Sequence, residues 1–203
     1  MIDSYLTIKD SSLHKITRTK SRFIALLSPA QSQDDVQQQL DDTRKTYHDA
    51  SSYCYAFRLL LDDTIVEASH DDGEPSGSAG LPMMQQLASR NLFNVLAVVI
   101  RYFGGTKLGV GGLVRAYSDA VFEALERATI VSHDLTARIT IRFPIEVNSS
   151  VMSIIHRFSA RIETLLYEER VRIEVTLPPS QVETFRAALT EATGARTELE
   201  VAL

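Results

Sequence analysis

Two stretches of the chain combine residue types suited to binding an anion. The first, HDDGEPSGSAG at residues 70–80, joins acidic and small polar side chains with three glycines and one proline. The second, RYFGGTKLGVGGLVR at residues 101–115, joins basic side chains with five glycines. Eight of the nine glycines in the chain lie between Gly73 and Gly112. We therefore expect unusual backbone conformations mainly in this region.

The second stretch lies between a predicted strand and a predicted helix. Residues 95–100 form an unbroken apolar run rich in β-branched side chains, which is typical of a strand covered on both faces. Apolar residues then recur at helical spacing over residues 113–125. A turn that leads into a helix N-terminus presents free N–H groups and the positive end of the helix dipole, which favour phosphate or carboxylate. Arg101, Lys107 and Arg115 add positive charge in the same window.

The glycine pattern matches neither of two familiar phosphate-binding motifs. GGTKLGVGG is not G-x-x-x-x-G-K-[ST], because Lys107 follows Thr106 and precedes Leu108, and it is not G-x-G-x-x-G. A purely structural alternative therefore stays open. In that alternative the glycines only permit a tight turn and close packing of the helix on the strand.

The acids of the first stretch, Asp71, Asp72 and Glu74, have two alternative roles. Their carboxylates could ligate a hard cation such as Mg²⁺, although the EF-hand spacing is absent. Alternatively, the loop is solvated and its acids pair with the basic side chains of the second stretch. We favour this second alternative and expect neither a resident metal nor a cofactor.

We expect the two stretches to fold against each other into one anion-receptive pocket. The candidate ligand-binding residues are Asp71, Asp72, Glu74, Ser76, Gly77, Arg101, Tyr102, Gly104, Gly105, Lys107, Gly109, Gly111 and Arg115. No Ser-His-Asp or Cys-His arrangement can be read from the spacing, so no catalytic residue is assigned and binding is favoured over catalysis. The single cysteine, Cys54, lies in an alternating apolar segment and is expected in the core.

The elements around these stretches predict an α+β fold with two domains. Before residue 132 we expect strands at 5–9, 51–61, 64–69 and 95–100, one or two strands within 13–27, a tight turn at Asp62 and Asp63, and helices at 32–47, 81–90 and 113–129. After residue 136 we expect strands at 136–143, 161–167, 170–177 and 197–202 and helices at 148–159 and 181–192. This β-α-β-β-α-β order is the ferredoxin-like pattern. We therefore assign residues 1–132 to an N-terminal domain and residues 136–203 to a ferredoxin-like C-terminal domain.

Composition limits how the protein can bind its partners. The formal net charge is −5, which argues against a chain held on nucleic acid or on an anionic membrane by bulk positive charge. The N-terminus has no signal-peptide pattern, and no apolar run approaches the ~20 residues of a membrane span. We therefore expect a soluble cytoplasmic protein that makes no membrane contact. Any contact with nucleic acid must use a local basic surface.

DDGEPSGSAGLP and VIRYFGGTKLGVGGLVRAY together resemble the IMPACT family, bacterial YigZ type. The similarity is strongest from His48 to Ala128 and includes R-Y-F-G-G-x-K-L-G at residues 101–109, while KSRFIALLSP at residues 20–29 fits the first strand of the family. The resemblance implies an N-terminal domain like domain 2 of ribosomal protein S5, which is similar to domain IV of elongation factor G. It also implies a C-terminal domain similar to domain V of that factor. Both similarities imply RNA or the ribosome as the partner.

The resemblance also suggests a role in translation. Eukaryotic members of the family regulate translation initiation by means of an additional N-terminal RWD domain. We expect this chain to lack that domain, so the resemblance implies the fold and the surface but not that mechanism. The function expected is that of a translation-linked protein that contacts RNA or the ribosome through the glycine-rich turn and the basic residues of the N-terminal domain.

Two other functions stay open from the sequence. One is an enzyme or sensor that holds a phosphorylated small molecule at the glycine-rich turn, with the acidic loop supplying acid–base groups or Mg²⁺. The other is a protein–protein module that pairs through the exposed edge of the C-terminal sheet. The sequence does not indicate an oligomeric state.

Overall fold

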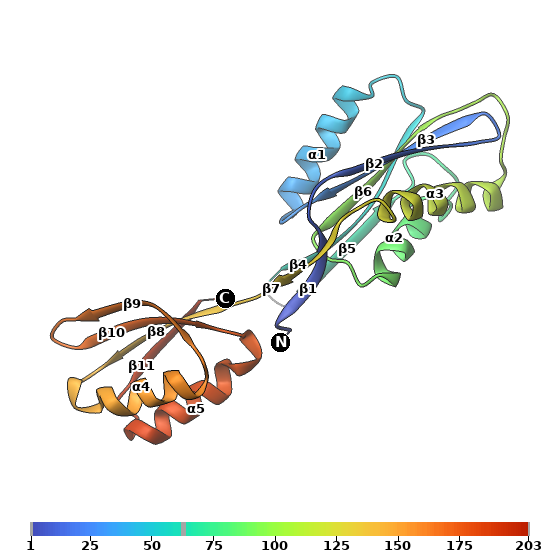
Figure 1. The fold of residues 1–203 in the computed structure, drawn as a ribbon. Helices are drawn as coiled ribbons and strands as arrows, with labels where there is room; N and C mark the ends of the chain where they lie inside the picture. The colour runs from blue at the N-terminus through green and yellow to red at the C-terminus, as the bar shows by residue number, and fades with distance from the viewer. Residues whose placement is uncertain (1, 62–63, 203) are drawn as a thin grey trace. The chain divides into compact units, whose positions relative to one another are not determined.

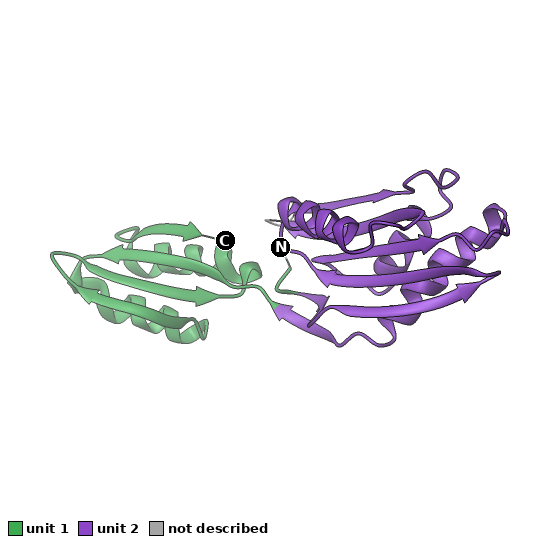
Figure 2. Ribbon diagram, turned by 90° about the horizontal axis from the view of Figure 1, so that it is seen from above, with its two compact units in different colours: residues 1–4, 134–203 green, residues 5–133 purple. Residues whose placement is uncertain are grey.

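The computed structural model describes residues 2–61 and 64–202, which form two compact units of mixed α and β structure (Figure 1). Residues 5–133 make up the larger unit, and residues 134–202 make up the smaller unit together with the segment before Tyr5 (Figure 2). The turn predicted at Asp62 and Asp63 lies outside the described residues. The assignment of residues 1–132 and 136–203 to the two named domains stays a prediction.

A five-stranded antiparallel sheet forms the centre of the larger unit. Its strands are β2 (Ser12–Arg18), β3 (Ser21–Pro29), β4 (Ser52–Leu61), β5 (Thr64–His70) and β6 (Val95–Tyr102), in the order β2-β3-β6-β4-β5. Because β6 lies at the centre of the sheet, residues 95–101 are all buried, as their apolar run predicts. The strand continues two residues beyond the expected end and therefore includes Arg101 and Tyr102.

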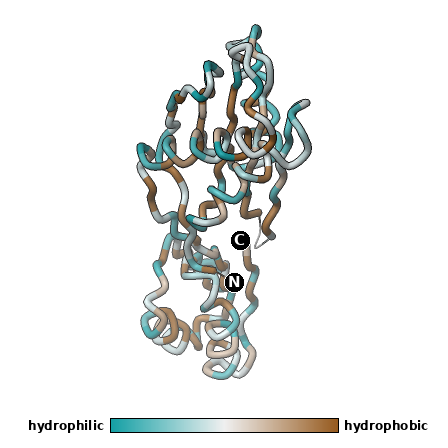
Figure 3. The backbone as a smooth tube through the Cα atoms, turned by 90° about the vertical axis from the view of Figure 1, so that its right-hand side faces the viewer, coloured by the Kyte–Doolittle hydropathy of each residue, from teal (hydrophilic) through white to brown (hydrophobic). Residues whose placement is uncertain are grey.

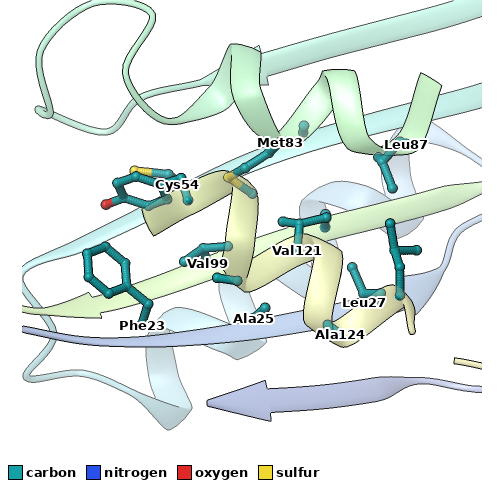
Figure 4. Packing of buried hydrophobic residues seen from close by; sticks show 14 of the residues in the cluster. Phe23, Ala25, Leu27, Cys54, Met83, Leu87, Val99, Val121 and Ala124 are labelled. Carbon is teal, nitrogen blue, oxygen red and sulfur yellow. The ribbon is translucent and has the colours of Figure 1, made fainter. Parts of the chain in front are cut away.

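Helices cover both faces of this sheet. α2 (Gly80–Ser89) and α3 (Val110–Leu125) pack on one face, and α1 (Gln33–Thr46) packs on the other (Figure 1). Figure 4 shows the α2/α3 side of the core, where Phe23, Val99 and Val121 lie together. Successive side chains of a strand point to opposite faces, so Arg101 lies on the α2/α3 face and Tyr102 on the α1 face.

The cap of α1 and the missed strand β7 illustrate what local sequence can and cannot indicate. Ser32 accepts a hydrogen bond from the backbone N–H of Asp35 at 3.0 Å, which confirms the predicted cap of α1.

In contrast, α3 ends at Leu125, before the expected end, and β7 (Ile130–Asp134) pairs with β1 (Ser4–Ile8) in a separate two-stranded sheet. Most side chains of β7 are exposed, so its sequence lacks the apolar alternation that predicts a strand.

The smaller unit has the ferredoxin-like order of elements predicted from the sequence. Its elements are β8 (Ala137–Phe143), α4 (Asn148–Arg157), β9 (Arg161–Tyr167), β10 (Val171–Leu177), α5 (Val182–Thr193) and β11 (Glu198–Ala202), with short 3₁₀ helices η1 (Ile145–Val147) and η2 (Pro179–Gln181) before α4 and α5. The sheet order is β11-β8-β10-β9, and every neighbouring pair is antiparallel. Gly194 ends α5 in the left-handed conformation, at φ 60°, as expected of a C-cap glycine.

Each unit has its own hydrophobic core. Two apolar clusters cover the two faces of the larger sheet, and a third lies between the smaller sheet and the helices α4 and α5. The hydropathy of the chain changes repeatedly between hydrophobic and hydrophilic along the elements of both units (Figure 3). Of the helices in the described ranges, each is too short or too polar to cross a lipid bilayer.

Candidate functional site

The glycine-rich segment begins with a close backbone contact between Gly104 and the β2–β3 turn. A Cβ atom at Gly104 would lie 2.1 Å from the carbonyl carbon of Lys20 and 2.2 Å from its oxygen, so a larger residue does not fit there. The N–H of Gly104 donates to Ser21 Oγ at 3.1 Å. Thr19 and Lys20 form the turn with φ values of 45° and 67°, which are typical of a tight hairpin. The contact therefore brings Lys20 next to the glycine-rich segment.

Arg101 and Glu74 form a buried ion pair near this contact. Arg101 Nη1 lies 2.6 Å and 2.7 Å from the two carboxylate oxygens of Glu74, and the two side chains are only 9% and 8% exposed. Glu74 Oε1 also accepts hydrogen bonds from the hydroxyls of Tyr117 at 2.8 Å and Ser52 at 3.0 Å. These bonds offset the cost of removing both charges from water. Glu74 therefore pairs with a basic residue of the second stretch, but inside the protein rather than in a solvated loop.

One pocket of about 380 Å³ brings the two candidate stretches together. Its lining residues are Glu74, Pro75, Arg101, Phe103, Lys107, Leu108, Gly109, Val110 and Leu113. The walls are mostly apolar, and the ring of Phe103 and the side chain of Val110 are 49% and 56% exposed. The acidic loop and the glycine-rich segment thus meet in one pocket, and the binding of an anion there stays a prediction.

The pocket is adjacent to the N-terminus of α3, where hydrogen-bond donors remain free. Gly109 precedes the helix with φ 71°, and no side chain in the described part of the chain caps α3 at this end. The first N–H groups of a helix have no acceptor within the helix itself, and they carry the positive end of its dipole. Arg101 Nε is also buried with no hydrogen-bond partner among the described residues. These donors favour an anionic or polar ligand.

Asp71 stabilises the fold of the acidic loop instead of lining the pocket. Its Oδ1 accepts from the N–H groups of Ala79 at 2.9 Å and Gly80 at 2.8 Å, and its Oδ2 accepts from that of Gly77 at 2.8 Å. Burial acts to raise the pKa of Asp71, but the three N–H groups outweigh it and hold the pKa below its usual range. The carboxylate therefore caps α2, whose own N-cap residue is Ala79.

Asp72 and Tyr102 interact with residues outside the pocket. Asp72 Oδ2 accepts from the backbone N–H of Tyr53 at 2.7 Å, and its Oδ1 lies 3.8 Å from Arg44. The centroid of the Tyr102 ring lies 4.5 Å from the guanidinium carbon of Arg22, on the α1 face of the sheet. The structure thus separates both residues from Arg101 and Glu74.

The structure gathers some of the candidate ligand residues and leaves others apart. Those that line the pocket are Glu74, Arg101, Lys107 and Gly109. Gly104, Gly105 and Gly111 belong to the same glycine-rich segment but do not line the pocket. The other candidates that do not line it are Asp71, Asp72, Ser76, Gly77, Tyr102 and Arg115. Across residues 2–61 and 64–202, no three His, Cys, Asp or Glu side chains converge in a way that could hold a metal ion. The carboxylates of the acidic loop bind different partners, which explains why they form no such cluster.

Sequence reasoning missed the polar side chains that hold Glu74. Ser52 lies 22 residues from Glu74 on a strand, and Tyr117 lies 43 residues away within an apolar helix face. Neither residue carries a local signal of this contact. Phe103 could have been found, because it is an aromatic residue that stands between the predicted strand and the glycine run, within the second candidate stretch.

Cys54 is buried, as predicted, and gives the site no nucleophile. Its Sγ lies 3.0 Å from the backbone oxygen of Asp71. Burial raises the pKa of the Cys54 thiol to about 12. The thiol therefore stays protonated and unreactive at neutral pH.

The chain matches two family models and several curated proteins. The Impact N-terminal domain matches residues 19–125, and the Domain of unknown function (DUF1949) matches residues 150–196. IMPACT family member YvyE from Bacillus subtilis (strain 168) is 33% identical over 200 residues, which cover 98% of this chain and 92% of that protein. IMPACT family member YigZ from Escherichia coli (strain K12) is 32% identical over 173 residues, which cover 85% of each.

Two further similarities differ in extent. Protein IMPACT from Oryctolagus cuniculus is 35% identical over 98 residues, which cover 46% of this chain and 30% of that protein. A solved structure described as the crystal structure of an hypothetical protein aligns with a TM-score of 0.68 and 29% identity, and the alignment covers 98% of this chain and 97% of that chain. The similarity to the animal protein is thus confined to less than half of this chain.

Proposed function

Because this chain belongs to the IMPACT family, we propose that it is a translation-linked protein that contacts RNA or the ribosome through its glycine-rich segment. One observation carries the proposal. The packing of Gly104 on the backbone of Lys20 brings this cation of the β2–β3 turn to those that follow β6. The exposed ring of Phe103 directly precedes this contact.

Three exposed cations of the segments that meet at Gly104 are what we call the basic surface: Lys20, Lys107 and Arg115. None of the three makes an ion pair with another described residue, whereas Arg18 and Arg101 are held by carboxylates. An unpaired cation can neutralise a phosphate without first breaking an internal pair. Since the net charge of the chain is −5, binding must depend on such a local surface.

An exposed aromatic ring next to unpaired cations is typical of proteins that bind single-stranded nucleic acid. The phosphates follow the positive charge, and the bases stack on the ring. Cys54 is protonated and buried, so its thiol supplies the site with no nucleophile. These features support binding rather than covalent catalysis.

The test measures the binding of a dye-labelled single-stranded RNA by fluorescence anisotropy, together with co-sedimentation with ribosomes. In the double variant Lys107→Gln/Arg115→Gln we expect affinity to fall about tenfold, because two phosphate contacts are lost. The matched control is Lys45→Gln, which removes an exposed cation that pairs with Asp42 on α1, and we expect no change. Absence of binding at low ionic strength, or equal affinity in the three proteins, would overturn the proposal.

A further inference from the structure

We infer that the pocket beside Phe103 receives one unstacked nucleobase, with the phosphate of the same nucleotide at the N-terminus of α3. This inference rests on the proposed function and adds the ligand of the pocket to it. Three properties of the pocket carry the inference: its apolar walls, the buried Arg101–Glu74 pair with the unpartnered Nε of Arg101, and the free donors where α3 begins.

The size and walls of the pocket suit a flat ring. Its volume is about 380 Å³, and its walls include Leu108, Leu113 and the ring of Phe103. A free phosphate would gain nothing from such apolar walls, whereas a base buries its faces against them. Phe103 is 49% exposed, so a base can reach its ring for stacking.

Arg101 and Glu74 supply both a donor and an acceptor to the edge of a base. The side chain of Arg101 is 9% exposed, and its Nε is buried with no partner among the described residues. Glu74 Oε1 accepts three hydrogen bonds, but Oε2 accepts one, from Arg101. Each nucleobase presents donor or acceptor atoms along its edge. A purely hydrocarbon ligand would leave the buried Nε of Arg101 unpaired, which is costly.

The phosphate finds its partners at the start of α3. Gly109 and Val110 line the pocket at the point where the helix begins. The first N–H groups of α3 have no acceptor within the helix, and this end of the helix attracts anions. Lys107 lines the same pocket and, in the described part of the chain, makes no ion pair. A nucleotide thus meets apolar walls and the Arg101–Glu74 pair with its base, and positive charge with its phosphate.

The experiment compares two RNA strands of equal length that carry the same phosphates, one with all its bases and one with abasic residues. We expect wild-type protein to bind the complete strand about fivefold or more tightly than the abasic strand. In Phe103→Ala we expect this preference to vanish while binding to the abasic strand persists. In Val110→Glu we expect both strands to bind more weakly, because the new carboxylate stands where the phosphate binds. That substitution is tolerated by the fold, since an acidic residue in the first turn of a helix is favourable.

Phe122→Ala is the matched control for Phe103→Ala. Phe122 is 46% exposed, its ring centroid lies 5.2 Å from the guanidinium carbon of Arg90, and it does not line the pocket. Phe103 has a similar arrangement, with the guanidinium carbon of Arg101 at 5.4 Å. We expect Phe122→Ala to keep the wild-type preference for the complete strand.

The outcomes separate this inference from the proposed function. Equal wild-type affinity for the complete and abasic strands overturns the inference and leaves the proposed function standing, because the basic surface alone binds phosphates. Loss of the base preference in Phe122→Ala as well as in Phe103→Ala also overturns the inference. If neither strand binds, the proposed function is overturned. The inference then holds only if a free nucleotide raises the melting temperature of the wild type and not that of Phe103→Ala.

Discussion

Arg101 and Glu74 join the acidic loop to the end of β6. Because both side chains are buried, removing either charge leaves the other in the protein interior without its charged partner. Replacing Arg101 with methionine leaves the Glu74 carboxylate in the protein interior with only hydroxyl partners. We expect Arg101→Met to lower the free energy of unfolding by about 3–5 kcal/mol, which is typical when one partner of a buried pair is removed. Urea denaturation followed by circular dichroism gives this value.

Arg127→Met is the control for this change. Arg127 lies 3.9 Å from Glu123 and its side chain is 51% exposed, so its loss is expected to change the free energy of unfolding by less than about 1 kcal/mol. Similar small losses in both variants would contradict the role given to the buried pair.

Gly104 and Gly111 belong to the same glycine-rich segment, but the structure has room for a larger side chain only at Gly111. A Cβ at Gly104 would overlap the backbone of Lys20, whereas a Cβ at Gly111 would meet no atom within 4 Å. We therefore expect Gly104→Ala to destabilise the protein by about 1–3 kcal/mol. We expect Gly111→Ala to stabilise it by up to about 1 kcal/mol, because alanine favours the helix. The midpoints of urea denaturation compare the two variants, and destabilisation by both would show that Gly111 also has a steric role.

At the scale of residues, the sequence indicated the kinds of side chain in the site but not their partners. The density of glycines predicted an unusual backbone, and positive φ values occur at Gly73, Gly77, Gly105 and Gly109. The contact of Gly104 with Lys20 depends on the pairing of β3 with β6, which joins segments about 80 residues apart in the chain. No local pattern records such a contact, and the same holds for Ser52 and Tyr117 around Glu74.

Among the elements, α2 shows how a loop can supply a cap from a distance. The Asp71 carboxylate binds the N–H groups of Ala79 and Gly80, while Ser32 caps α1 within the usual local pattern. A cap three residues from its donor can be read from sequence, but one eight or nine residues away cannot. The sequence analysis therefore predicted the start of α1 and its cap. It assigned the Asp71 carboxylate to ligand binding, whereas in the structure this carboxylate caps α2.

The cap of α2 should make stability depend on pH. The pKa of Asp71 is held below its ordinary value of 3.8, so the ionised group contributes its full stabilisation above that value. Below it the unfolded chain binds more protons than the folded chain, and the contribution is lost as the pH falls through the folded pKa. We expect Asp71→Asn to cost about 2 kcal/mol at pH 7, because the amide NH2 cannot accept from the N–H of Gly77 and leaves that donor unpaired.

Urea denaturation over a series of pH values tests this expectation. The difference in the free energy of unfolding between wild type and Asp71→Asn should shrink as the pH falls from neutral to below 3.8. Asp10→Asn, at an exposed position between β1 and β2, serves as the control and should show no such change. A difference that stays constant with pH would mean that the charge of Asp71 does not stabilise the cap.

For the whole molecule, the net charge of −5 and the small basic surface together determine how binding should respond to salt. A protein that binds nucleic acid by bulk charge shows a steep decrease of affinity with salt, because many counterions are released. Here the basic surface offers three cations, Lys20, Lys107 and Arg115, that are unpaired within the described residues. Each phosphate contact to a single strand contributes about 0.7 to the slope of log K against log salt, so we expect a slope of about −2. We expect Lys107→Gln to reduce the slope by about 0.7 and Lys45→Gln to leave it unchanged. Anisotropy titrations at several salt concentrations measure the slope, and a value several units steeper would show that the RNA contacts other parts of the chain.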